Sequence, residues 1–203
     1  MSTQETDTEQ LILKAAKNVF FKKGYDGARM QEIADEAGMN KALLHYYFRS
    51  KDKLFEAIFK NAFQQFIPVM VENILSGISL EKKIEIFVDN YLKVLIENPQ
   101  LPNFVLTEIN RDPDRIFEMF GKMGFKPEIV LQSIQKDMDE GKVKSMDPRH
   151  LLINIISLCA FPFAAKPLMQ IMLFNNDAQK YNDFLEERKK EVSQFIIHSI
   201  KIN

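Results

Sequence analysis

The segment from residue 41 to residue 51 carries side chains that could read a DNA groove. These side chains are Lys41, Ala42, Leu43, His45, Tyr46, Tyr47 and Lys51. Lysine and tyrosine can donate hydrogen bonds to base edges or phosphates, and small apolar side chains can pack on thymine methyl groups. From residue 40 to residue 60 the chain has five basic residues against two acidic ones, although its net charge is -1. This pattern favours a phosphate-facing surface that is confined to one region.

Two short helices joined by a tight corner would position these side chains. Ile33, Ala34 and Ala37 fall on one face of a helix, which is the spacing of a helix that buries a single stripe. Gly38 follows, and glycine adopts the positive φ of a sharp corner without a steric penalty. The segment therefore predicts a helix-turn-helix.

The second of these helices is predicted from Asn40 to Phe48. Asn40 is a favourable N-cap, and Leu44 and Phe48 lie four residues apart, so this pair would anchor the helix in the core. At 3.6 residues per turn Tyr46 then faces away from the pair, and a core position for Tyr46 is the less favoured interpretation. The side that is left over fits a DNA major groove.

At these residues the sequence resembles the TetR family of bacterial transcriptional regulators. The resemblance rests on an AxxAGxxxxxLxxYF core followed by Ser-Lys and a leucine, which here comprises Ala34, Ala37, Gly38, Leu44, Tyr47, Phe48, Ser50, Lys51 and Leu54. It covers about the first 60 residues at motif level. It implies DNA contact at Arg29, Met30, Asn40, Lys41, Ala42, Leu43, His45, Tyr46, Tyr47 and Lys51.

The sequence departs from the family pattern in two places. A threonine is usual near Arg29 or Met30, where it caps the second helix, so we expect Arg29 to contact a phosphate in its stead. A tyrosine is usual at the position of His45 and a histidine is common at that of Tyr47. The order of the aromatic side chains is therefore altered, and the individual roles of His45 and Tyr47 stay open.

The composition is that of a helical globular protein. The 203 residues are 46% hydrophobic and 27% charged, with few glycines and prolines for a many-turned β protein. No apolar run has the length of a membrane span, and the polar start of the chain does not resemble a signal peptide. Cys159 is the only cysteine, which suits a reducing compartment. We therefore expect a cytoplasmic protein with no membrane partner.

Amphipathic segments without any strand pattern predict an all-α fold of about nine helices. With the resemblance, we expect a three-helix DNA-binding domain at residues 1–50 and a helical effector-binding and dimerisation domain at residues 51–203. Apolar residues from Leu54 to Ile74 continue at helical spacing and predict one helix of about six turns, interrupted near Pro68. A helix of this length would connect the predicted DNA-binding domain to the rest of the chain.

The sequence also predicts partners. The segments from Pro148 to Leu173 and from Ala178 to Ile200 are more apolar than one core requires, which favours a homodimer over a buried monomer core. A dimer would place two reading helices about 34–36 Å apart on double-stranded DNA with a palindromic operator. The resemblance further implies a small apolar effector. Candidate ligand-binding residues are Phe63, Phe66, Phe87, Tyr91, Phe104, Phe120, Met123 and Phe163, each of which could also be plain core.

The resulting expectation is a ligand-responsive transcriptional regulator, with repression as the family default and activation left open. An enzyme is not expected, because the three histidines are scattered and no nucleotide-binding or nucleophile motif occurs. Cys159 lies in an apolar run and is more typical of an inert thiol. We therefore expect no catalytic residue, no metal and no cofactor. The alternative function is an all-helical adaptor that binds a partner helix and no DNA.

Overall fold

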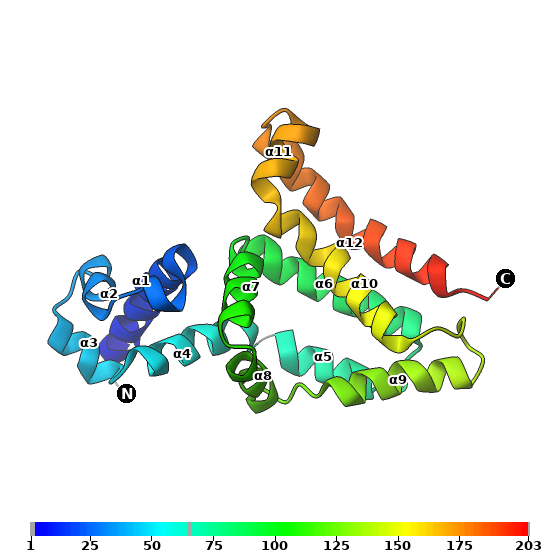
Figure 1. The fold of residues 1–203 in the computed structure, drawn as a ribbon, viewed down its shortest axis with the longest axis horizontal. Coiled ribbons are helices and arrows are strands. Elements are labelled where there is room, and N and C mark those ends of the chain that lie inside the picture. Colours follow the sequence, from blue (N-terminus) through cyan, green and yellow to red (C-terminus); the bar gives the residue numbers. More distant parts are fainter. Residues whose placement is uncertain (1–2, 65, 203) are drawn as a thin grey trace. The chain divides into compact units, whose positions relative to one another are not determined.

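The computed structural model describes residues 3–64 and 66–202, and within them it contains α-helices and no strand (Figure 1). The helices are α1 (Thr3–Gly27), α2 (Met30–Glu36), α3 (Lys41–Tyr47), α4 (Lys51–Phe63), α5 (Phe66–Leu75), α6 (Leu80–Glu97), α7 (Leu101–Arg111), α8 (Pro113–Lys122), α9 (Pro127–Asp139), α10 (Pro148–Ala164), α11 (Lys166–Phe174) and α12 (Ala178–Ile200). The predicted all-α fold class is confirmed.

The described residues form twelve helices where the sequence suggested about nine, because two apolar segments are divided and residues 113–122 form a helix of their own. The predicted long helix ends at Phe63, and α5 begins at Phe66. Pro68 is therefore the third residue of α5, where its missing N–H has no helical acceptor to lose. The interruption expected near Pro68 lies a few residues earlier.

The second division separates α10 from α11 at Ala165, where the two helices are bent by 78°. Pro167 is one of the first two residues of α11, a position at which proline is well tolerated. No single helix in the described ranges is long and apolar enough to cross a membrane; α10 and α11 meet that test only as this bent pair.

Contacts divide the chain into two units. Unit 1 comprises residues 1–65 and 103–123, and unit 2 comprises residues 66–102 and 124–203. The contacts thus group α4, α7 and α8 with the first three helices, whereas the functional boundary predicted from the sequence lies at residue 50. The functional assignment of residues 1–50 and 51–203 remains a prediction.

Unit 1 is built on the inner face of α1, which packs on α2 and α4. The amphipathic stripe of this helix is buried throughout and consists of Ile12, Ala15, Ala16, Val19 and Phe20. The ring of Phe20 packs edge-on against Phe55 of α4 at 5.5 Å, and Phe104 of α7 lies 5.6 Å from Phe55 on the centroid-to-centroid measure. Helices α4 and α7 therefore close the small core that positions α2 and α3.

Unit 2 is organised around α6, which contacts α5, α10 and α12. The buried residues of α6 are Leu80, Ile84, Val88, Leu92 and Leu95, which recur every three or four residues as expected for one inward stripe. Helix α12 buries Tyr181, and the hydroxyl of this tyrosine donates a hydrogen bond to the carbonyl of Pro162. That bond satisfies a carbonyl in α10 and ties the two C-terminal helices together.

Candidate nucleic-acid interface

The corner between α2 and α3 has the geometry that the sequence predicts. Gly38 has φ +67°, and the space around its α-carbon is open, so the requirement for glycine is conformational and not steric. The N–H groups of Gly38 and Met39 donate to the carbonyls of Asp35 and Ala34 at 3.1 and 3.0 Å. These bonds end α2 and turn the chain into the next helix.

Asn40 begins α3 as an N-cap. Its Oδ1 accepts a hydrogen bond from the N–H of Leu43 at 2.8 Å, which satisfies one of the free donors at the start of the helix. Leu44 is fully buried and Phe48 is 8% exposed, so this pair anchors α3 to unit 1. The predicted orientation of the helix is therefore present in the structure.

The opposite side of α3 is open to solvent. Tyr46 is 73% exposed, and the other exposed residues of this side are Lys41, Ala42, Leu43 and His45. Tyr47 is half-buried, and its ring meets that of Tyr46 edge-on with 5.4 Å between the centroids. These side chains form one continuous face, which we call the reading face, with Lys41 at one end and the two tyrosines at the other.

The remaining predicted DNA contacts lie around the reading face. Arg29 is exposed and stands at the N-cap of α2, where its own side chain makes no capping bond. Asn40 is exposed, and Met30 is half-buried. Whether these residues touch DNA remains a prediction.

Lys51 is one of the predicted DNA contacts, and its side chain also makes contacts within unit 1. Its Nζ donates to the carbonyl of Ala28 at 2.8 Å and lies 4.4 Å from the centre of the Tyr25 ring. Its ammonium group therefore already has partners inside unit 1, which competes with the predicted phosphate contact.

The eight candidate ligand-binding residues are divided between the two units. Phe63, Phe104, Phe120 and Met123 belong to unit 1, whereas Phe66, Phe87, Tyr91 and Phe163 belong to unit 2. In unit 1 the rings of Phe63 and Phe120 lie 5.2 Å apart, while Phe104 stacks on Phe21 at 4.6 Å. Met123 is half-buried at the end of α8.

In unit 2 the ring of Phe66 lies 5.4 Å from that of Phe87 and 5.3 Å from that of Tyr91. Burial raises the pKa of the Tyr91 hydroxyl, with a smaller contribution from Cys159, so this phenol stays protonated. Phe163 is buried in α10. The aromatic cluster of Phe66, Phe87 and Tyr91 is thus the part of the predicted ligand set that unit 2 brings together.

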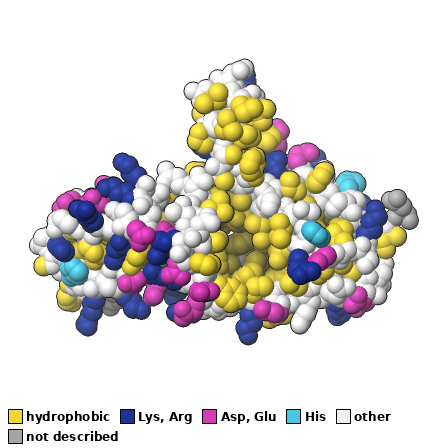
Figure 2. Space-filling view, viewed as in Figure 1, with side chains coloured by type: hydrophobic (Ala, Val, Ile, Leu, Met, Phe, Trp, Pro, Cys, Tyr) yellow, Lys and Arg dark blue, Asp and Glu magenta, His cyan; other side chains and the backbone are white. Residues whose placement is uncertain are grey.

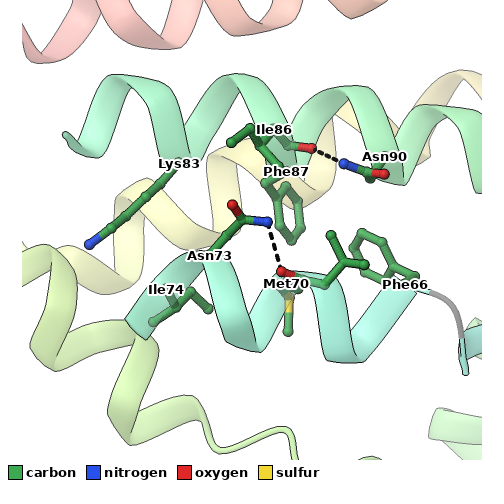
Figure 3. Close-up of a pocket in the computed structure, with 9 residues that line it drawn as sticks. Phe66, Met70, Asn73, Ile74, Lys83, Ile86, Phe87 and Asn90 are labelled. Carbon is green, nitrogen blue, oxygen red and sulfur yellow. Dashed lines mark hydrogen bonds between the residues drawn. The ribbon is translucent and has the colours of Figure 1, made fainter. Parts of the chain in front are cut away.

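A small pocket opens between α5 and α6 beside this cluster (Figure 3). Phe66, Met70 and Asn73 of α5 and Phe87 of α6 line it, and the Phe87 ring lies between the two helices (Figure 3). The cavity measures about 20 Å³, which is room for about one water molecule. A second cavity of about 50 Å³ lies on α6, α9 and α10, and Phe87 lines both.

Glu108 of α7 is a buried residue that was not among the predicted site residues. It is fully buried in α7, where its Oε1 accepts the N–H of Tyr25 at 2.7 Å. The available signal was its spacing, because Glu108 follows Leu101 and Phe104 on the inward stripe of the helix. Among the residues that the structure describes, no group of three His, Cys, Asp or Glu side chains could hold a metal ion.

The fold and the reading face define a helical protein with an N-terminal helix-turn-helix of the DNA-binding type. Residues 12–58 match the family model for bacterial regulatory proteins of the tetR family. The chain is 24% identical to a probable HTH-type transcriptional regulator of Bacillus subtilis (strain 168), YttP, over 181 residues, which cover 87% of each protein. Residues 12–58 are therefore similar to the DNA-binding region of the tetR family, and most of the chain is similar to a regulator of the HTH type.

Solved structures show the same fold along the whole chain. The crystal structure of HlyIIR, a hemolysin II transcriptional regulator, has a TM-score of 0.70 at 23% identity and covers 98% of this chain and 99% of its own. The transcriptional regulator FadR from Bacillus subtilis, in complex with stearoyl-CoA, has a TM-score of 0.66 at 20% identity, with coverages of 93% and 97%. At these identities the two structures support the fold alone.

Proposed function

We propose that the protein is a cytoplasmic repressor that binds a palindromic operator in double-stranded DNA as a homodimer and is released by a small apolar effector. The observation that carries the DNA-binding part is the reading face. A tyrosine that is 73% exposed stands beside an exposed leucine and lysine, while Leu44 on the opposite side is fully buried. Such a face contributes little to the core of unit 1, and its donors and apolar groups suit base edges in a major groove.

Exposed apolar side chains on α10, α11 and α12 support the homodimer. They are Ile153, Ile156, Phe161, Leu168, Ile171, Met172, Leu173 and Phe195, which we call the C-terminal apolar surface. Helix α11 has no buried residue although most of its side chains are apolar, and hydrophobic side chains gather over it in Figure 2. A nine-residue helix is marginal without packing, so a second copy that covers this surface would stabilise it.

A groove in the same surface favours a partner with an acidic group. It has a volume of about 430 Å³ and is lined mostly by apolar side chains, with Ser157 of α10 and Arg188 of α12. Arg188 donates from Nη2 to the carbonyl of Leu158 at 2.6 Å, but its buried Nε has no hydrogen-bond partner among the described residues. A half-buried guanidinium with an unused donor is costly, and a carboxylate from the second copy would offset that cost.

The effector part of the proposal rests on the aromatic cluster in unit 2. FadR from Bacillus subtilis holds stearoyl-CoA in its solved structure, and for the present chain we infer a ligand with an apolar body. Phe87 lines both small cavities together with Ile74 and Lys83, and we infer that a rotation of its ring joins them into one site. We propose that the effector enters there and displaces Phe87 from its contact with Phe66.

The experiment that tests DNA binding is a selection from a pool of random-sequence duplexes, followed by footprinting of the enriched sequence. We expect a protected palindrome whose half-sites are about one helical turn apart, or a multiple of that spacing. The logarithm of affinity should fall with the logarithm of salt concentration, with a slope of about -0.9 for each phosphate neutralised. Straight-chain fatty acids and their CoA thioesters, added as probes, should release the duplex.

An all-helical adaptor remains the second candidate, since the C-terminal apolar surface could also receive a partner helix. Apolar docking does not weaken with salt as DNA binding does. Failure to enrich any duplex, together with salt-independent binding of a partner helix, would favour the adaptor.

A further inference from the structure

Tyr25, at the corner that Gly24 makes near the end of α1, is surrounded by cationic side chains of unit 1. Lys51 Nζ and Arg111 Cζ each lie 4.4 Å from the centre of its ring, and Arg115 Cζ lies at 4.7 Å. The Tyr25 hydroxyl donates to Asp52 Oδ1 at 2.7 Å, and Arg115 Nη2 lies 3.0 Å from the same oxygen. The ring thus joins the start of α4 to α7 and α8 through cation–π contacts and one shared carboxylate.

Glu108 holds the backbone of this corner. Gly24 has φ 65° and ψ 180°, which interrupts the helical hydrogen bonds of α1. The N–H of Tyr25 donates to Glu108 Oε1 at 2.7 Å, and Arg111 Nε donates to Glu108 Oε2 at 2.8 Å. Glu108 is fully buried, and a carboxylate is rarely buried unless its charge and lone pairs are satisfied. Here Arg111 balances the charge of Glu108, and the N–H of Tyr25 and Nε of Arg111 donate to its two oxygens.

The contacts around Tyr25 also determine where the helix-turn-helix begins. Lys51 Nζ donates to the carbonyl of Ala28, which is itself buried, and the next residue, Arg29, is the N-cap of α2. Any shift of the corner at Gly24 therefore moves the first residue of α2. Helix α2 is joined to α3, which bears the reading face, by the turn at Gly38. The cluster links α7 and α8 to α2 within one unit.

We propose that Glu108 and Arg115 are positioning residues for DNA binding, which act through Tyr25 to hold the reading face in its binding orientation. This inference rests on the proposed function and adds a means of regulation to it. A displacement of α7 and α8 reaches the reading face through the Glu108 and Arg115 contacts with Tyr25 and Asp52.

The test compares Glu108→Gln with the wild-type protein on two duplexes of equal length, one selected by the wild-type protein and one unrelated. The amide of the variant still offers an oxygen to Tyr25, but it places N–H groups against Arg111 and removes the charge. We expect affinity for the selected duplex to fall about tenfold, within the range of energetic coupling between sites. Affinity for the unrelated duplex should change less than about twofold, because the phosphate contacts are kept. Anisotropy of labelled DNA measures both affinities, and circular dichroism establishes that the variant is folded.

Glu118→Gln is the matched control, because Glu118 is an exposed carboxylate of α8 that pairs with Lys122 at 2.8 Å. It makes the same change in charge and should leave both affinities within about twofold of wild type. If Glu108→Gln does not fold, Tyr25→Phe is the variant that tests the inference. It removes only the hydrogen bond from the hydroxyl to Asp52, and we expect its affinity for the selected duplex to be about threefold weaker than that of the wild-type protein.

The inference is overturned if the folded variant binds the selected duplex as tightly as wild type. It is also overturned if both duplexes weaken equally, since a purely structural role would have that effect. An unfolded Glu108→Gln combined with unchanged binding by Tyr25→Phe would overturn it as well. If the wild-type protein selects no duplex at all, the proposed function fails first and this inference falls with it.

Discussion

Phe195→Ala should weaken the proposed homodimer. Phe195 is 66% exposed on α12, which for a phenylalanine of about 200 Å² corresponds to about 130 Å² of surface that a partner could cover. At about 25 cal/mol per Å² the full covering of this area contributes about 3 kcal/mol in each protomer. An isologous dimer contains the contact twice.

Buried area converts only partly into affinity, because association also costs translational and side-chain entropy. We therefore expect a loss of about 2–4 kcal/mol for the dimer, which raises its dissociation constant roughly 30- to 1,000-fold. Sedimentation velocity over a range of protein concentrations measures this constant, and circular dichroism should show unchanged helix content.

Phe117→Ala is the matched control for this experiment. Phe117 is 60% exposed, but it lies on α8 in unit 1 and outside the C-terminal apolar surface. Its replacement should leave the dissociation constant unchanged. Equal effects of the two substitutions, or a wild-type protein that is monomeric at every concentration, would refute the assignment of the dimer to α10–α12.

Three further predictions concern stability and reactivity. Leu44→Ala should lower the free energy of unfolding by about 2–5 kcal/mol, because the side chain is fully buried; a denaturant titration measures this, and a change below 1 kcal/mol would contradict the packing of α3. Burial raises the pKa of the Cys159 thiol to about 12, so a thiolate-specific reagent at pH 8 should modify it only after unfolding; rapid modification of the native protein would revive a reactive role. Hydrogen bonds from Arg149 lower the pKa of Asp147, the N-cap of α10, to about 2. The stability that this ionised N-cap adds to α10 is therefore present above pH 4 and is lost as the pH falls from 4 towards 2. An acid-unfolding curve of Asp147→Asn should be flatter over that range of pH.

The local part of the DNA-reading unit could be predicted from the sequence. The boundaries expected for the second helix differ by one residue at each end from those of α3, and Leu44 and Phe48 are buried as expected. Gly38 adopts the positive φ that the corner requires. Each of these features depends on residues less than ten positions apart, so spacing and capping preferences are sufficient to find them.

The contacts of Tyr25 could not be predicted in that way. Glu108 is 83 residues away in the sequence, and no periodic pattern brings the two together. The break between α4 and α5 was expected near Pro68, because proline interrupts a helix interior. It lies a few residues earlier, because Pro68 falls in the first turn of α5, where proline is tolerated. The partners of Lys51 were not predicted either, because Ala28 and Tyr25 depend on the corner that Gly24 creates, and the DNA contact of Lys51 stays a prediction.

The central claim is that the exposed side of α3 contacts DNA, and the affinity of Tyr46→Ala for the selected duplex tests it most directly. We expect binding about 10- to 100-fold weaker than wild type, as for the loss of a base or phosphate contact, with the free energy of unfolding within about 0.5 kcal/mol of wild type. Leu75→Ala, at a similarly exposed position on α5 (67%), should bind as wild type does. Full affinity in Tyr46→Ala would contradict the account and move the DNA-binding surface away from α3.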